Sequence, residues 1–395
     1  MMSNNLQGVV DRIKAAASAG TPLRIRGGGT KDFYGQSLQG DILDTTGLNG
    51  ITSYEPSELV VTVQAGTPLA ELEAVLAEKN QCLPFEPPHF EKKWGTADEP
   101  IDILPAFART QTTVGGMVAA GLSGPSRASS GSVKDFVLGV NMLNGKGEEL
   151  HFGGTVMKNV AGYDVSRLMA GSMGTLGLLT EVSLKVLPIA PAEATLKFEC
   201  SQSEAINMLN TWGAQPLPLN ASCWIQEVGQ GVLYVRLRGA VAAVEAAIKK
   251  MGGHERGEYA GVLQNAASGN ATVAADWQAL RHQAMDFFKL QGGECLWRLS
   301  VPDTAPDLQL GDTLVEWHGA QRWVKLPYSE AVRIRSQVYG LGGSAILFVA
   351  NEAMNTLAIE VFSPLRAPLD RIHRDLKRQF DPAGVFNRGR MFADM

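Results

Sequence analysis

The sequence has few of the features that mark membrane, nucleic-acid-binding or secreted proteins. No run among its 395 residues reaches the roughly 18 consecutive apolar residues of a membrane span, and residues 1–20 lack the basic start and apolar block of a secretory signal. The formal net charge is −5 and the basic residues are scattered, which provides no electrostatic footprint for nucleic acid. We therefore expect a cytoplasmic protein with no membrane span and no nucleic-acid partner.

Residues that bind metals are also sparse. The four cysteines lie far apart and form no C-x-x-C pair, so the sequence offers ligands for neither an iron–sulfur cluster nor a zinc ion. The six histidines form no H-x-x-x-H pair. We expect reduced, structural thiols and no metal site.

Glycine, by contrast, is abundant and clustered. Residues 23–26 form a short alternating run that predicts a strand, and Gly27, Gly28 and Gly29 follow directly. Three residues without a Cβ let the backbone turn and aim several N–H groups into one concavity that suits a phosphate. This is not the dinucleotide fingerprint of a Rossmann unit, because no G-x-G-x-x-G opens a helix here. On this stretch alone, a glycine-rich loop without a ligand is nearly as good an interpretation.

The first half of the chain alternates short β-rich runs with segments of small residues. Apolar residues spaced i, i+3, i+4 and i+7 predict a helix over residues 3–19. Small residues dominate 112–121 and 129–135, and such a bare backbone permits close approach to a bulky flat ligand. The charged, irregular residues 89–109 predict a surface insertion. Strands are predicted at 42–45, 51–54, 59–63, 137–143, 149–152 and 178–187.

The second half follows the β-α-β-β-α order of a ferredoxin-like unit. Its predicted elements are strands at 195–199, 223–227 and 232–238 and helices at 203–212 and 241–251. A looser repeat follows, with strands at 295–301, 323–325, 345–349 and 357–361 and helices at 329–339 and 368–379. The fold class is therefore predicted to be α+β.

Five loops occur in an order that resembles one known family. Arg-Gly-Gly-Gly-Thr at 26–30, Val-Gln-Ala-Gly-Thr at 63–67, Thr-Val-Gly-Gly at 113–116, Gly-Ser-Val-Lys-Asp at 131–135 and Gly-Ser-Met-Gly-Thr-Leu-Gly at 171–177 resemble the FAD-binding domain of the vanillyl-alcohol oxidase and p-cresol methylhydroxylase (PCMH) type. Residues 380–387 are similar to the family's returning tail, although Arg388 stands where a proline is usual. The resemblance implies a two-subdomain FAD-binding domain at 1–190, a ferredoxin-like cap at 191–375 and a returning tail at 376–395.

The resemblance also implies which residues hold FAD. The first loop would offer N–H and hydroxyl donors to the pyrophosphate with Arg26 neutralising its charge, and the later loops would line the adenosine and ribityl parts. Residues 1–81 contain no His or Cys, so a non-covalent FAD is expected, with Cys82 and His89 as the remaining candidates for a tether. The implied cofactor-binding residues are Arg26, Gly27, Gly28, Gly29, Thr30, Lys31, Thr113, Gly115, Gly116, Gly131, Ser132, Asp135, Gly171, Ser172, Gly174, Thr175, Gly177, Leu178 and Asn387.

Two further segments, 158–164 and 316–323, are similar to the smaller FAD-binding subunit family of bacterial glycolate oxidases. That similarity implies a complex with a larger FAD-containing subunit and an iron–sulfur subunit. It also implies a small 2-hydroxy acid as substrate, and a cytoplasmic location peripheral to the inner membrane through the partner subunits.

The implied reaction transfers a hydride from the α-carbon of a 2-hydroxy acid to the flavin, which requires a group that holds the carboxylate and a base. Arg322 and His318 supply these chemistries and Tyr328 or Arg333 could assist, although a solvated loop without a catalytic role is the other interpretation. Residues 190–395 also lack the Gly-His-x-Gly-Asp-Gly-Asn-x-His element of the larger subunit and related D-lactate dehydrogenases. Three functions therefore stay open: an oxidoreductase subunit, an FAD-binding subunit that serves assembly only, and an independent FAD enzyme acting on another polar substrate such as a sugar.

Overall fold

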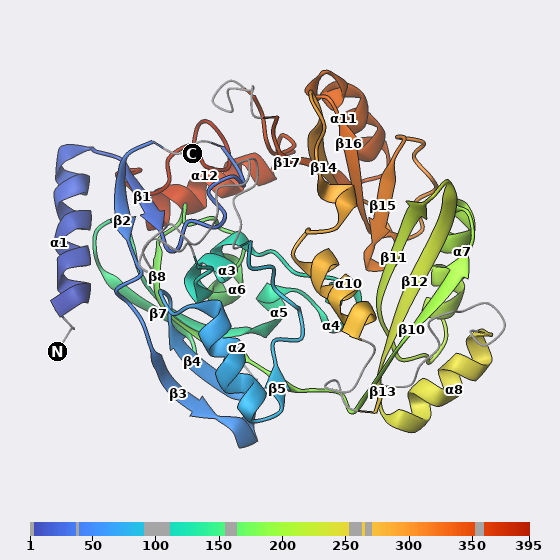
Figure 1. Ribbon diagram of the computed structural model, residues 1–395. Helices are drawn as coiled ribbons and strands as arrows, with labels where there is room; N and C mark the ends of the chain where they lie inside the picture. Colours follow the sequence, from blue (N-terminus) through green and yellow to red (C-terminus); the bar gives the residue numbers. More distant parts are fainter. Residues whose placement is uncertain are drawn as a thin grey trace.

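The computed structural model describes residues 4–36, 39–90, 111–154, 164–252, 263–264, 271–351 and 359–395. Most of the predicted insertion at 89–109 and of the motif at 158–164 lies outside these residues. Within the described parts, no helix has the length and apolar character needed to cross a membrane. Figure 1 shows an N-terminal part and a C-terminal part side by side, with the last helix back on the N-terminal part.

The N-terminal part begins with a helix and a two-stranded parallel sheet. Helix α1 (Asn4–Ala19) buries Val10 and Ile13 against strand β1 (Leu23–Arg26) and strand β2 (Asp41–Asp44). The apolar stripe predicted for residues 3–19 is thereby explained, because it covers this small sheet.

A five-stranded antiparallel sheet forms the rest of the N-terminal framework. Its order is β3-β4-β8-β6-β7, with β3 (Ile51–Glu55), β4 (Val60–Gln64), β6 (Val137–Leu143), β7 (Glu149–Gly153) and β8 (Leu178–Lys185). A further pair joins β5 (Gln81–Cys82) to β9 (Leu187–Pro188). The helices of this part are α2 (Leu69–Glu78), α3 (Val114–Ala120), α4 (Arg127–Ser130), α5 (Val133–Phe136) and α6 (Val165–Met169).

The C-terminal part is built on an eight-stranded sheet. Its first unit contains β10 (Ala192–Glu199), α7 (Gln202–Gly213), β11 (Leu219–Glu227), β12 (Gln230–Gly239), α8 (Val241–Met251) and β13 (Leu263–Gln264). These strands lie in the order β13-β10-β12-β11, which is the 4-1-3-2 order of the predicted ferredoxin-like unit.

The second unit repeats this order with one helix missing. Strands β14 (Cys295–Ser300), β15 (Thr313–Glu316), β16 (Gln321–Leu326) and β17 (Ser344–Val349) lie in the order β15-β16-β14-β17, with α11 (Ala331–Gly340) before the last strand. Residues 301–312 are irregular where the first unit has a helix. The sequence did not predict β15, and residues 359–361 do not form the strand predicted at 357–361.

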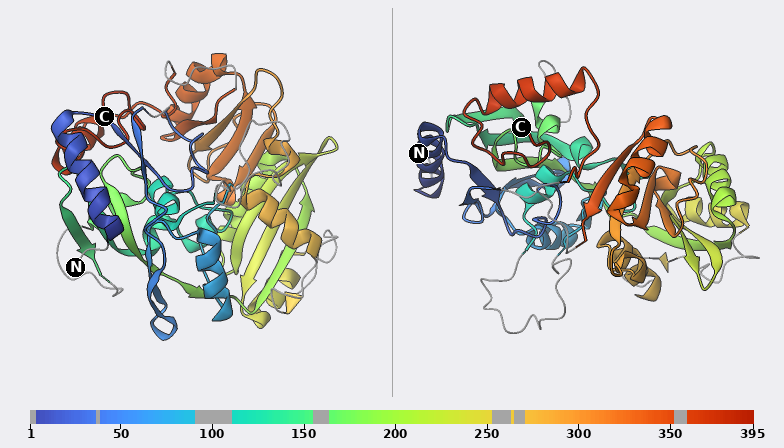
Figure 2. Two further views of the ribbon diagram at one scale, coloured as in Figure 1. Left: turned by 60° about the vertical axis from the view of Figure 1, so that its left-hand side comes forward. Right: turned by 90° about the horizontal axis from the view of Figure 1, so that it is seen from above.

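The two faces of the eight-stranded sheet have different partners. Helices α7, α8 and α11 pack on one face. The opposite face packs against the N-terminal part, with α10 (Ala271–Arg281) contributing Trp277 and Leu280 to the same apolar cluster as Tyr34, Phe90 and Met173. Figure 2 shows the sheet between its covering helices and the N-terminal part. Side chains on this inner face are the ones that can approach a site in the N-terminal part.

The C-terminal segment of the chain packs against the N-terminal part. Helix α12 (Leu369–Phe380) places Leu376 and Phe380 on the core of the five-stranded sheet, and Phe386 forms a parallel bridge with Leu23 of β1. The predicted boundary between residues 375 and 376 therefore falls inside α12, and this helix belongs to the returning segment rather than to the second repeat.

Candidate cofactor site

The first glycine loop is in close contact with the segment that enters α3. The hydroxyls of Thr30 and Thr112 lie 2.9 Å apart. A Cβ on Gly28 would lie 1.6 Å from the carbonyl oxygen of Gln111, and one on Gly27 would lie 2.3 Å from Thr113 Oγ1. Glycine is thus required at both positions, because the first loop and the segment that enters α3 approach too closely for a Cβ. The sequence predicted these glycines as a turn that aims N–H groups at a phosphate, and the structure adds this second requirement.

Gly28→Ala is expected to separate these loops and to abolish FAD retention, because the added Cβ cannot coexist with the Gln111 carbonyl. The measurement is the ratio of flavin to protein after gel filtration. Gly8→Ala is the matched control, since a Cβ at Gly8 meets nothing within 4 Å. A Gly28→Ala protein that keeps a full equivalent of flavin would contradict this placement of the loops.

The C-terminal segment fastens a third loop to the first. The Asn387 side chain accepts a hydrogen bond from the Ile25 N–H (2.8 Å) and donates one to the Met173 carbonyl (2.7 Å). Arg390 donates to the carbonyls of Gln36 (2.8 Å) and Lys31 (2.9 Å), and burial lowers its pKa to about 10. The loop at 171–177 is thereby held beside the loop at 27–31, although the two are about 140 residues apart in sequence.

These segments enclose one elongated cleft. Small residues of α3 line it and leave room for a flat group. The cleft is lined by Ile25, Arg26, Gly27, Gly28, Gly29, Thr30, Lys31, Asp32, Tyr34, Thr45, Ala65, Thr113, Gly115, Gly116, Ala119, Ala120, Ser172, Met173, Gly174, Gly177, Leu179, Asn387 and Arg390.

Two cations at the first loop give the cleft positive character. The Arg26 guanidinium is 2.8 Å from Asp32. Among the described residues, Lys31 Nζ contacts the hydroxyls of Thr30 (3.4 Å) and Thr112 (3.3 Å) and lies 5.6 Å from the ring centroid of Phe90, and burial lowers its pKa to about 7. Burying a charged lysine without a carboxylate partner costs free energy. An anion bound in the cleft would offset this cost.

The cleft brings together most of the predicted cofactor residues but not all of them. Those outside its lining are Gly131, Ser132, Asp135, Gly171, Thr175 and Leu178. Ser132 and Asp135 cap α5, where the Asp135 carboxylate accepts from the Ser132 N–H and hydroxyl at 2.9 Å. The Thr175 hydroxyl donates to the Ser172 carbonyl at 2.7 Å, and Leu178 is fully buried in the core under α1. Local structural roles account for Ser132, Asp135, Thr175 and Leu178.

Several lining residues were missed. Ala119, Ala120 and Met173 lie within stretches already rich in small residues, so the extent of those stretches was the available signal. Arg390 carries no motif, because its role depends on carbonyl groups that only the fold brings to it.

Two of the three predicted catalytic residues lie on the wrong face of the cap sheet. Arg322 pairs with Leu299 and is fully buried, and its guanidinium donates to the carbonyls of Gly319, Pro306 and Ala305. Tyr328 stacks on Trp297 with ring centroids 6.0 Å apart, in the core beneath α11. Neither residue lines the cleft, so the structure gives no support to a catalytic role for Arg322 or Tyr328 there.

His318 lies between the two parts of the molecule but is fully engaged there. Its Nδ1 and backbone N–H are each 3.0 Å from Ser222 Oγ, and its Nε2 is 3.0 Å from Ser129 Oγ. Burial lowers its pKa to about 4. His318 does not line the cleft and its ring nitrogens are occupied, so the structure supports an interface role rather than that of a base.

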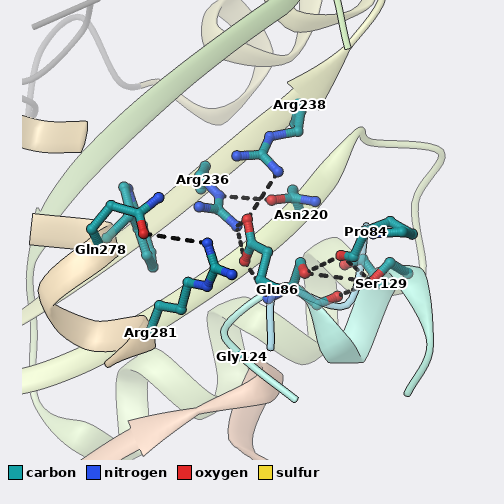
Figure 3. Close-up of polar contacts among 12 residues, drawn as sticks. Pro84, Glu86, Gly124, Ser129, Asn220, Arg236, Arg238, Gln278 and Arg281 are labelled. Atoms are coloured by element: carbon teal, nitrogen blue, oxygen red, sulfur yellow. Dashed lines mark hydrogen bonds and ion pairs between the residues drawn. The ribbon is translucent and has the colours of Figure 1, made fainter. Parts of the chain in front are cut away.

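A cluster of charged side chains joins the two parts nearby. The Glu86 carboxylate accepts from Arg236 Nη2 at 2.7 Å, from Arg238 Nη1 at 3.0 Å and from the Ser126 N–H at 3.1 Å. Figure 3 shows Glu86 pointing at both arginines of β12. Burial raises the pKa of Glu86, but the two guanidinium groups outweigh it and bring the value to about 2. This cluster holds the cap on the N-terminal part.

Comparisons with known proteins agree with the fold and the cleft. A family model described as an FAD binding domain matches residues 3–92. A solved structure of alkyldihydroxyacetonephosphate synthase superposes with a TM-score of 0.64 at 13% identity, covering 96% of this chain and 75% of that one. The fold and the cleft therefore define a protein with an FAD-binding domain.

Full-length similarity identifies the family more narrowly. The glycolate oxidase subunit GlcE of Escherichia coli is 42% identical over 391 residues, which are 98% of each chain. The subunit GlcD of Bacillus subtilis is 30% identical over 44% of this chain and 34% of its own length. The chain belongs to the family of the glycolate oxidase subunit GlcE.

Proposed function

We propose that this chain is the FAD-binding subunit of a complex that oxidises glycolate to glyoxylate and passes the electrons through flavin to an iron–sulfur subunit. The observation that carries the proposal is the 42% identity to GlcE over 98% of both chains, together with a cleft built from the expected loops. A larger FAD-containing subunit is the other partner. We place the complex on the cytoplasmic side, with any membrane contact made by the partners.

The donor set of the cleft fits FAD. Amides of the first loop and the cations Arg26 and Lys31 suit a diphosphate, and the small residues of α3 suit a flat ring system. Among the described residues, Cys82 and His89 do not line the cleft, which supports non-covalent binding. Bound FAD supplies the two-electron acceptor, and the chain's own residues position it and exclude water.

The domain organisation follows from the same contacts. We propose that residues 1–190 and the returning segment from Leu369 onward form the FAD-binding domain, and that the intervening residues form the cap. The Glu86 cluster then connects domain and cap.

A subunit that binds FAD only for assembly is the second candidate. It is favoured by one observation: Arg322, His318 and Tyr328 are all engaged away from the cleft. A substrate site in this chain would have to use other residues.

Anaerobic mixing with glycolate tests the proposal. We expect the visible flavin band of this subunit to bleach when its partners are present, since the complex as a whole transfers the hydride. Bleaching of the purified chain alone would indicate direct chemistry here. A flavin that stays oxidised in both cases would favour assembly alone, and a chain that retains no FAD would overturn the proposal.

A further inference from the structure

Two arginines between the FAD-binding domain and the cap have no carboxylate partner within ion-pair distance among the described residues. The Arg127 guanidinium of α4 lies 4.4 Å from the ring centroid of Trp317. Arg298 of β14 donates to the Tyr34 hydroxyl at 3.4 Å and lies 5.8 Å from the ring centroids of Tyr34 and of Phe348. Both side chains are only half-buried, so a small solute can reach them.

Strand register places Arg298 on the face of the cap sheet that packs against the FAD-binding domain. Arg298 pairs with Trp323, whose indole donates to the Glu316 carboxylate at 2.6 Å, and Glu316 directly precedes Trp317. Arg298 therefore approaches from the cap sheet, whereas Arg127 approaches from the FAD-binding domain. Burial lowers the pKa of Arg127, the charge of Arg298 lowers it further, and Asp135 raises it.

Glu316 lies near Arg298 on the cap sheet, but among the described residues the two form no ion pair. Burial raises the pKa of Glu316 to about 7, even though Trp323 and Gln321 donate to its carboxylate and the charge of Arg298 lowers the pKa. Arg127 and Arg298 are thus half-buried on the two sides of the junction between domain and cap without an ion-pair partner among the described residues, an arrangement that favours an anion between domain and cap.

The Arg pair adjoins the cofactor cleft. Tyr34, which hydrogen-bonds Arg298, also lines the cleft at the end of the first loop. We propose that Arg127 and Arg298 bind the carboxylate of a small 2-hydroxy acid at the junction of domain and cap, beside the cleft. This inference rests on the proposed function and assigns to Arg127 and Arg298 the role first predicted for Arg322.

The chemistry of the two side chains suits a carboxylate. A guanidinium presents a planar fork of donors that matches a carboxylate, and aromatic rings lie against both groups, Trp317 at Arg127 and Tyr34 and Phe348 at Arg298.

Oxalate is a suitable probe, because it has the carboxylate and the size of glycolate but no C–H bond to give up. We expect saturable binding of oxalate to the FAD-loaded chain in calorimetry and in flavin difference spectra. Arg298→Met and Arg127→Met should each weaken binding about 10- to 100-fold, the effect of losing a hydrogen bond to a charged group. Glu316→Gln, which keeps a neutral acceptor for Trp323, should change it less than about threefold.

Arg378→Met is the matched control, because Arg378 is an exposed arginine of α12 paired with Asp375. It should bind oxalate as the wild type does, and thermal midpoints and flavin content should confirm that every variant is folded. Unchanged oxalate affinity in both Arg127→Met and Arg298→Met would overturn the site, as would the absence of oxalate binding to the wild-type chain and complex.

The outcome also separates this inference from the proposed function. Oxalate binding that depends on both arginines, without bleaching by glycolate, supports the anion site and counts against glycolate oxidation. Bleaching by glycolate that persists at wild-type KM in both variants supports the function and overturns the site.

Discussion

Lys377→Met is expected to lower the free energy of unfolding by about 3–5 kcal/mol and to release FAD, because it breaks a buried ion pair from one side. Lys377 is 6% exposed, and its Nζ donates to Asp381 Oδ2 (2.7 Å), the Thr175 carbonyl (2.7 Å) and the Phe386 carbonyl (2.8 Å). The substitution leaves the Asp381 carboxylate, itself 1% exposed, without a counter-charge.

Removal of the Lys377 amine should also disturb the cofactor site, because this amine links the C-terminal segment to a loop of the cleft. Thr175 belongs to the third loop of the cleft, and Phe386 precedes Asn387, which ties the first loop to the third. Chemical denaturation gives the change in stability, and the flavin-to-protein ratio gives the change in retention. Arg378→Met is the control, since Arg378 is exposed and pairs only with Asp375 at the surface. Equal stability of the two variants would contradict the assignment.

The features predicted best from the sequence are those that a local pattern of residues determines. The stripe of α1, the strand before Gly27 and the hairpin from β6 to β7 all follow from spacing and turn residues within a few positions. The glycine loops were found for the same reason, since a turn or a close approach demands glycine wherever it occurs.

Strand register and long-range contacts could not be predicted from local sequence patterns. Arg322 and Trp323 differ by one position, and the pleat sends Arg322 to the face under α11 and Trp323 to the face toward the cleft. A short apolar run such as β15 gives little periodicity to identify. The pair of Arg127 with Arg298 is 171 residues apart in sequence and was therefore invisible to motif analysis.

Glu86→Gln is expected to destabilise the protein by about 3–5 kcal/mol at neutral pH, mainly by loosening the cap. The change leaves Arg236, which is 3% exposed, without the carboxylate that lies 2.7 Å away. Glu330→Gln is the control, since its pair with Arg333 is at the surface and should contribute at most about 1 kcal/mol.

The pH dependence of this effect has a definite sign. The pKa of Glu86 is about 2 in the folded protein, against an ordinary value of 4.5, so its ionised form is favoured by folding. The stabilisation is complete above pH 4.5 and is lost as the pH falls toward 2, with a total of about 3 kcal/mol. The difference in unfolding free energy between wild type and Glu86→Gln should therefore shrink as the pH is lowered from 5 to 3. A difference that stays constant over that range would show that the guanidinium groups of Arg236 and Arg238 do not depend on a charged Glu86 to hold the cap.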